Sequence, residues 1–380
     1  EEMVVRTLSL DPESMMNQVL DGSAAFQSIT PDSSVWLGQL DRAWSAQLAD
    51  EDATVVGETV RYAVSPVAIT MWEEVAREMG WPDRAIGWED LLTRAQTDPD
   101  FRWSHPSTNS ASGLLATLAA FYAGAGKTRG LTIDDVTDQN TLDYVAALEK
   151  TVRYYGEGNE PALIERALAE GRDFLDAFVV QEQMVVEFNA RRQSGQERLV
   201  ALYPVEGALW EDHPLALLET AGLTPYQRQV FARFRDYLLS PDAQQLVLQH
   251  GYRPADYSIP SDGPDSPLTA ANGVDPSEPK TTLQVPNAGV IEVVRDVWWY
   301  TKRHTNVYLV VDTSGSMEGH KIEQAREALR IFLDQIKGDM ERVGLIQFST
   351  RVDNVLYLDE LGDNRNALND AVDTMNAEGD

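Results

Sequence analysis

One short segment constrains the fold of this chain more than any other: a continuous apolar run that ends in a polar loop. Val307 to Val311 form the run, and Asp312 to Met317 form the loop. Such a run is typical of a strand buried on both faces, as in a parallel sheet. An amphipathic stretch from Lys321 to Ile336 follows and predicts a helix. The order of strand, loop and helix indicates the start of an α/β domain.

The polar loop carries a carboxylate and two hydroxyls at alternate positions: Asp312, Ser314 and Ser316. It lies at the carboxyl end of the predicted strand, where open α/β sheets bind their ligands. Hard oxygen ligands of low total charge suit Mg²⁺ or Mn²⁺, which keep several waters and leave one position for a carboxylate from outside. The spacing therefore favours metal binding over nucleophilic chemistry. The alternative is an ordinary turn with a helix N-cap.

This region resembles the von Willebrand factor A domain, whose metal-ion-dependent adhesion site (MIDAS) begins with Asp-x-Ser-x-Ser after the first strand. Asp312, Ser314 and Ser316 match that motif position by position. The segments beyond it also follow the family's order, with a second strand in 339–349, a third in 352–358 and a helix in 364–375. The resemblance implies a Rossmann-like domain, a divalent cation, Mg²⁺ or Mn²⁺, at the loop, and a protein partner.

The family completes its metal site with a threonine and an aspartate on later loops. This chain ends at Asp380, close to where the threonine is expected. We therefore expect the site to be incomplete in these residues, with water or buffer ions replacing two ligands. Metal binding should then be weak, and the position need not be occupied.

The first 250 residues alternate short apolar runs with amphipathic stretches, a pattern typical of an α/β domain. Helix starts are predicted at Ser112-Gly113 and at Thr224-Pro225, because hydroxyl caps and a proline in the first turn are typical there. No internal repeat of fixed period is present, so solenoid folds are excluded.

Residues 1–257 resemble the two-lobed, type 2 bacterial extracellular solute-binding proteins in the order of their segments. Five segments carry the likeness: Thr30–Trp36, Ser65–Ile69, Asn109–Gly113, Tyr203–Gly207 and Phe234–Pro254. The resemblance implies a periplasmic-binding-protein-like fold with the ligand between two lobes. In that family hydroxyls, amides and helix N-terminal N–H groups hold the ligand, a chemistry suited to oxyanions and other small polar solutes.

The candidate ligand contacts lie mostly where predicted strands meet helices. They are Ser33, Ser34, Ser65, Asn109, Ser112 and Asn189. For each serine the alternative is a cap or a turn, and Asn189 can equally be a satisfied interstrand residue. The chain departs from the family at its start, because its first predicted strand, near Val4, corresponds to the family's second. We therefore expect a cleft that lacks a wall or is filled differently.

A change in composition separates the two regions. Between Tyr257 and Pro286 the chain is rich in Pro, Ser, Asp and Gly with little apolar periodicity, and a helical stretch from Val290 to Tyr300 follows. We expect a solute-binding-protein-like domain at 1–257, a strap or linker with a short helix at 258–302, and the N-terminal part of an A domain at 303–380.

The composition excludes several classes of protein. Acidic residues outnumber basic ones by 61 to 31, and a net charge of −30 repels phosphate backbones, so no nucleic-acid partner is expected. The absence of cysteine excludes disulfides and thiolate metal sites. No run of about 18 apolar residues occurs, so no transmembrane segment is expected in this chain. From the resemblances we expect an exported protein, anchored at the cell surface as a lipoprotein in its full length.

No residue pattern of an enzyme is present. The five histidines show no metal-ligand spacing, and no Gly-x-Ser-x-Gly elbow accompanies them. His213, which follows Glu211 and Asp212, is predicted to lie in a polar turn. We expect a non-enzymatic extracellular binding protein whose A domain contacts a protein partner in adhesion. Two alternatives are a transport receptor for a small polar or oxyanion solute and a chelatase-like metal-insertion subunit, although the chain lacks a Gly-x-x-x-x-Gly-Lys motif.

Overall fold

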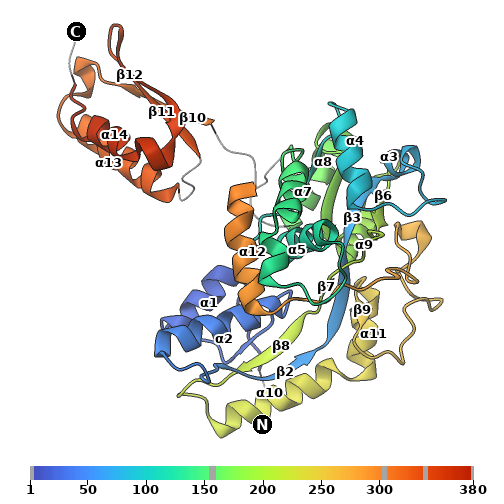
Figure 1. The fold of residues 1–380 in the computed structure, drawn as a ribbon. Coiled ribbons are helices and arrows are strands. Elements are labelled where there is room, and N and C mark those ends of the chain that lie inside the picture. Colours follow the sequence, from blue (N-terminus) through green and yellow to red (C-terminus); the bar gives the residue numbers. More distant parts are fainter. Residues whose placement is uncertain (1–3, 154–159, 302–305, 337–340, 378–380) are drawn as a thin grey trace. The chain divides into compact units, whose positions relative to one another are not determined.

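The computed structural model describes residues 4–153, 160–301, 306–336 and 341–377. The chain divides into two compact units, Glu1–Asp296 and Val297–Asp380 (Figure 1). Both units combine helices with sheets, so the expected α/β class is confirmed. The finer division of the chain at residues 257 and 302 stays a prediction.

The first unit contains two sheets, which we call lobe 1 and lobe 2 together with their helices. The sheet of lobe 1 is antiparallel, with the strand order β1-β8-β2. Its strands are β1 (Ser28–Ile29), β8 (Pro214–Leu218) and β2 (Val56–Arg61), and its helices are α1 (Pro12–Leu20), α2 (Val35–Leu48), α10 (Pro225–Leu238) and α11 (Pro241–Gln249). Alternating residues of β8, Leu215 and Leu217, pack against Phe231 of α10 in a small apolar core.

The sheet of lobe 2 has the strand order β4-β5-β3-β6. Its strands are β4 (Trp103–Ser104), β5 (Ala177–Gln181), β3 (Ala63–Trp72) and β6 (Leu199–Leu202). Its helices are α3 (Glu73–Glu78), α4 (Trp88–Thr97), α5 (Ala111–Ala125), α6 (Ile133–Thr137), α7 (Gln139–Glu149), α8 (Glu160–Glu170) and α9 (Glu182–Arg191), with a 3₁₀ turn η1 (Gly171–Asp173). The two central strands β3 and β5 are almost wholly buried and apolar, because helices cover both faces of the sheet.

A set of short strands at the start of β3 joins the two lobes. β3 continues from β2 through Tyr62, and its first residues pair with β7 (Trp210–Glu211) and β9 (Arg253–Pro254). We call β7, β9 and the first four residues of β3 the hinge strands. After β9 the chain runs through the 3₁₀ turn η2 (Ala270–Asn272) to α12 (Ala288–Thr301). We call residues 257–287 the strap.

Local sequence explains where two of these helices begin. Thr224 caps α10 and forms a capping box with Gln227, so the predicted helix start at Thr224-Pro225 is confirmed. α5 begins earlier than predicted, because Ser110 and not Ser112 is its N-cap and accepts the N–H of Gly113 at 3.2 Å. A Cβ on Gly113 would lie 2.0 Å from the carbonyl oxygen of Ser107, so only glycine allows this close approach.

The second unit is a three-stranded sheet with helices packed against it. Its strands are β10 (Asn306–Asp312), β11 (Arg342–Phe348) and β12 (Val352–Glu360), and its helices are α13 (His320–Gln335) and α14 (Leu361–Asp373), with a 3₁₀ turn η3 (Gly315–Met317). β10 is parallel to β11 and β12 is antiparallel to it. Val343 and Leu345 of β11 form a core with Leu333 of α13 and Leu368 of α14. The predicted order of strands and helices is confirmed.

Two expectations about burial are wrong. Residues Val4 to Leu8 form no strand, and Val4 and Leu8 are 67% and 63% exposed. The run from Val307 to Val311 does form a strand, but it is not buried on both faces. Leu309 and Val311 pack against the core, whereas Tyr308 and Val310 are 42% and 60% exposed, since the helices described here cover one face of the sheet.

Burial in α5 predicts which leucines stabilise the first unit. Leu114 is fully buried, so Leu114→Ala should lower the free energy of unfolding by about 2–5 kcal/mol, through lost apolar contacts and the cavity left behind. Leu246 of α11 is 47% exposed, and Leu246→Ala should change that free energy by well under half as much. Urea unfolding followed by tryptophan fluorescence measures both. Equal effects of the two substitutions would contradict the burial assigned to α5.

Candidate functional site

The N-terminus of α2 is capped by the carboxylate of Asp212, the residue that follows β7. The backbone N–H of Ser34 donates to Oδ1 of Asp212 at 2.7 Å, and Oγ of the fully buried Ser33 accepts the N–H of Val35 at 3.4 Å. Asp32 accepts the indole N–H of Trp36 at 2.8 Å. The two candidate serines therefore already have partners within the chain.

The N-terminus of α5 meets the same region. Ser112 is fully buried in the first turn, and its hydroxyl donates to Oε1 of Glu211 at 2.5 Å. The carboxylate of Asp32 accepts the N–H of Ala111, and burial of Asp32 nonetheless raises its pKa. Helix N-termini attract anions. Here the anions are carboxylates of the chain itself: Asp32, Glu211 and Asp212.

Ser65 and Asn189 are structural contacts. Ser65 is fully buried on β3, directly opposite Glu211 in the sheet register, and its Oγ accepts the N–H of Gln183 at 3.1 Å. Asn189 of α9 donates to the carbonyl oxygens of Leu199 and Asn272 and accepts the N–H of Leu199 at 3.1 Å. The structure thus brings Ser34, Ser65 and Ser112 to β7 and its following residue Asp212, whereas Asn189 fastens α9 to β6 and η2.

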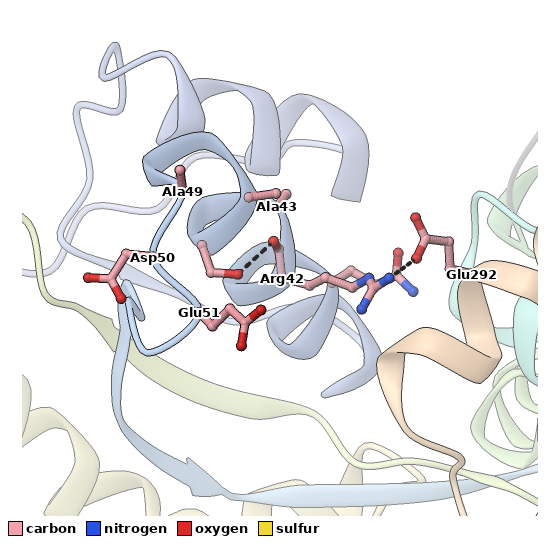
Figure 2. A pocket seen from close by; sticks show the side chains of 9 residues that line it. Arg42, Ala43, Ala49, Asp50, Glu51 and Glu292 are labelled. Atoms are coloured by element: carbon pink, nitrogen blue, oxygen red, sulfur yellow. Dashed lines mark hydrogen bonds and ion pairs between the residues drawn. The ribbon is translucent and has the colours of Figure 1, made fainter.

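Asn109, the last of the six candidates, faces α12. Its side chain is exposed, and its Oδ1 accepts from the guanidinium of Arg295 at 3.2 Å. One turn earlier on α12, Glu292 forms an ion pair with Arg42 of α2 (Figure 2). α12 therefore contacts lobe 1 and lobe 2 at once, at the middle of α2 and just before the start of α5.

A hollow of about 530 Å³ lies where α12 meets α2, and Figure 2 shows the side chains that line it. Small residues of α2 leave this space, and the loop after α2 adds two carboxylates, Asp50 and Glu51. The ion pair between Arg42 and Glu292 lies at its edge and is about half exposed at both ends, so it contributes at most about 1 kcal/mol to stability.

A buried cluster of Glu182, Arg253 and Tyr203 holds the hinge strands. Arg253 of β9 forms two hydrogen bonds to Glu182 of α9, at 2.9 and 2.6 Å, and Glu182 also accepts the hydroxyl of Tyr203. The same guanidinium donates to the carbonyl oxygens of Asp275, Pro276 and Glu278 in the strap. Burial and the charge of Glu182 hold the pKa of Tyr203 well above its ordinary value, so its proton stays in place. This cluster joins α9, β9 and the strap.

His213 follows Glu211 and Asp212 in the sequence and is neutral at physiological pH. Burial lowers its pKa to about 4. One ring nitrogen lies 3.2 Å from Oε1 of Gln181, and the ring meets that of Tyr252 edge to face. The polar turn predicted here is thus a buried segment, with φ of 34° at His213. Sequence reasoning missed that Glu211 and Asp212 are hydrogen-bond acceptors for Ser112 and Ser34. Two adjacent carboxylates between the apolar segments 208–210 and 214–218 are a signal that the chain itself supplies such acceptors.

The predicted metal loop of the second unit gathers its oxygens in one place. Asp312 ends β10, and its Oδ1 accepts the N–H of Ser314 at 2.8 Å. The hydroxyls of Ser314 and Ser316 are hydrogen-bonded to each other, with their oxygens 3.0 Å apart. The backbone N–H and the hydroxyl of Ser314 lower the pKa of Asp312, which keeps the carboxylate charged. The loop is fixed to β11 by Thr313, whose N–H and hydroxyl both donate to the carbonyl oxygen of Phe348.

This donor set fits a small divalent cation. Octahedral Mg²⁺ with Mg–O distances of about 2.1 Å places neighbouring ligand oxygens about 3.0 Å apart. The two serine hydroxyls have that separation, beside a charged carboxylate. In the described part of the chain no group of three or more His, Asp or Glu side chains could hold a metal.

Two family profiles match the chain. The profile described as "Bacterial extracellular solute-binding protein" matches residues 16–253, and the "von Willebrand factor type A domain" matches residues 306–380. Both resemblances inferred from the sequence are thereby confirmed. The chain is also 51% identical over 47 residues to inter-alpha-trypsin inhibitor heavy chain H3 of Mus musculus. This stretch covers 12% of the chain and 5% of the mouse protein.

Solved structures share the fold of the larger region. A periplasmic thiamin binding protein aligns with a TM-score of 0.52 and 12% identity, over 77% of this chain and 85% of that one. A crystal structure titled as an ABC transporter from Clostridium perfringens ATCC 13124 aligns with a TM-score of 0.51 and 11% identity, over 77% and 87%. At this identity the likeness shows the fold alone.

The contact between Ser34 and Asp212 predicts the effect of removing one charge. Asp212→Asn should lower the free energy of unfolding by about 0.3–1 kcal/mol, because the α2 N-terminus loses its negative charge while the amide oxygen of asparagine still accepts the N–H of Ser34. Asp265→Asn, an exposed residue of the strap, is the matched control and should be nearly neutral. Urea unfolding measures both. If the two variants are equally stable, the negative charge of Asp212 does not stabilise the N-terminus of α2.

Proposed function

The chain belongs to the family of bacterial extracellular solute-binding proteins and carries a von Willebrand factor type A domain, and from this we propose that it is a surface binding protein. In this proposal the A domain holds a protein partner through a divalent cation at Asp312, Ser314 and Ser316. The solute-binding family is typically non-enzymatic, and we extend that property to the whole chain.

The observation that carries the proposal is the convergence of three oxygens at the end of β10. The hydroxyls of Ser314 and Ser316 have the spacing of neighbouring ligands on Mg²⁺ or Mn²⁺, and Asp312 supplies a full negative charge. A cation held by so few protein ligands keeps open positions, and a carboxylate from a partner protein can fill one. When bound, the ion supplies the positive charge for that contact, while Thr313 keeps the loop fixed to β11.

The arrangement of the lobes supports a role as a platform rather than as an oxyanion transporter. The N–H groups that would hold an oxyanion between α2 and α5 already bind Asp32 and Asp212, and the hydroxyl of Ser112 binds Glu211. A negative solute would have to displace the carboxylates of Asp32 and Asp212 from these N–H groups. We therefore do not assign a solute to Ser33, Ser34, Ser65, Asn109, Ser112 or Asn189.

The location of the protein follows its family. The matching profile describes extracellular proteins, which agrees with export. Within the described ranges, none of the helices has both the length and the apolar character to cross a bilayer. Attachment of the full-length protein to the cell surface as a lipoprotein is part of our proposal.

Removal of one carboxylate tests the metal site. Titration calorimetry with MnCl₂ should show binding that weakens at least about tenfold in Asp312→Ala, because the one full negative charge of the loop is lost. Asp334→Ala on α13 is the matched control; Asp334 is exposed, and its replacement should leave Mn²⁺ binding unchanged. Equal Mn²⁺ affinity in wild type and Asp312→Ala would show that the loop is a plain turn.

A further inference from the structure

A second cavity of the first unit, of about 500 Å³, lies against the hinge strands. Cavities of roughly 300–1,000 Å³ are typical of small-molecule sites. Its walls come from the end of β2, the hinge strands and two segments of the strap, residues 257–261 and 282–285. None of the six residues that the sequence suggested for solute binding lines it. We call it the hinge pocket.

The walls of the hinge pocket offer two aromatic rings. Trp210 is held in place, because its indole N–H donates to Oγ1 of Thr282 at 3.3 Å and the guanidinium of Arg253 lies 5.1 Å from its ring centroid. Tyr257 is 86% exposed although it lines a cavity. Ile259, Leu283 and Val285 complete an apolar surface. A flat apolar group can therefore be stacked here.

Two opposite charges also line the hinge pocket. Arg61 is exposed, and among the described residues its guanidinium forms no ion pair within 4 Å; Arg253, by contrast, is paired with Glu182. The carboxylate of Asp212 is partly exposed and binds one N–H, that of Ser34. Arg61 and Asp212 do not pair with each other, although Arg61 lies opposite Pro214, two residues from Asp212. Both residues line the hinge pocket, so it presents one charge of each sign.

We propose that the hinge pocket binds an aromatic amino acid. Its carboxylate pairs with Arg61, its ammonium group with Asp212, and its ring lies against Trp210 and Tyr257. A bidentate contact to a carboxylate suits the guanidinium of Arg61, and the aromatic walls select a flat side chain over a polar one. This site is independent of the metal loop, and it gives the solute-binding module a ligand that the capped ends of α2 and α5 do not.

Titration calorimetry with three probes tests the hinge pocket. L-Phenylalanine carries both charges, 3-phenylpropionate lacks the ammonium group, and phenethylamine lacks the carboxylate. We expect L-phenylalanine to bind and each analogue to bind at least about tenfold more weakly, since each loses one charge contact. Absence of L-phenylalanine binding, or an equal affinity for all three, would overturn the proposal.

Substitutions in the hinge pocket locate the site. Arg61→Gln should weaken the binding of L-phenylalanine at least about tenfold and leave the binding of phenethylamine unchanged. Tyr257→Ala should weaken the binding of both compounds. The matched controls are Arg233→Gln and Tyr226→Ala on the exposed face of α10, which should bind as wild type does. Wild-type binding by Arg61→Gln would refute the assignment. Asp312→Ala should not affect L-phenylalanine binding, so failure of this site is distinguishable from failure of the metal site.

Discussion

The arrangement of the hinge strands, α9 and the strap in the first unit depends on the buried ion pair between Arg253 and Glu182. Removing two charges from water is unfavourable, and such a pair is tolerated where further hydrogen bonds satisfy its remaining polar atoms. Here the hydroxyl of Tyr203 and three carbonyl oxygens of the strap do so. The pair thereby joins α9 of lobe 2, strand β9 and the strap. It also fixes Trp210, over whose ring the guanidinium lies, and with it one wall of the hinge pocket.

Near the hinge strands, the N-termini of α2 and α5 have N–H groups that could bind an anion. Carboxylates of the chain itself bind them. Asp212 accepts the N–H of Ser34 at the start of α2, and Glu211 accepts the hydroxyl of Ser112. Asp32 accepts the N–H of Ala111 at the start of α5. α12 then contacts both lobes through Glu292 and Arg295. These contacts connect the two lobes of the first unit. The hinge pocket differs, because Trp210 and Tyr257 line it together with Arg61, for which the described residues supply no ion-pair partner within 4 Å.

The sequence predicted what depends on neighbouring residues and missed what depends on distant ones. The strand, the Asp312 loop and the helix after it are local features, and the spacing of three oxygens follows from a single turn. The partners of the candidate serines are not local: Ser34 meets Asp212 across 178 positions, and Ser112 meets Glu211 across 99. Hydroxyls at strand-to-helix junctions look alike whether a solute or a carboxylate of the chain satisfies them. The exposure of Val310 was missed for a similar reason, since an apolar run does not show which faces are covered.

The central claim is that Asp312, Ser314 and Ser316 hold a divalent cation together. The most direct test is a crystal of the protein soaked in MnCl₂, with diffraction recorded at a wavelength where manganese scatters anomalously. We expect an anomalous peak within about 2.0–2.4 Å of the carboxylate of Asp312 and of the two serine hydroxyls, with water in the remaining positions. A crystal that shows manganese at other carboxylates and none at this loop would contradict the account.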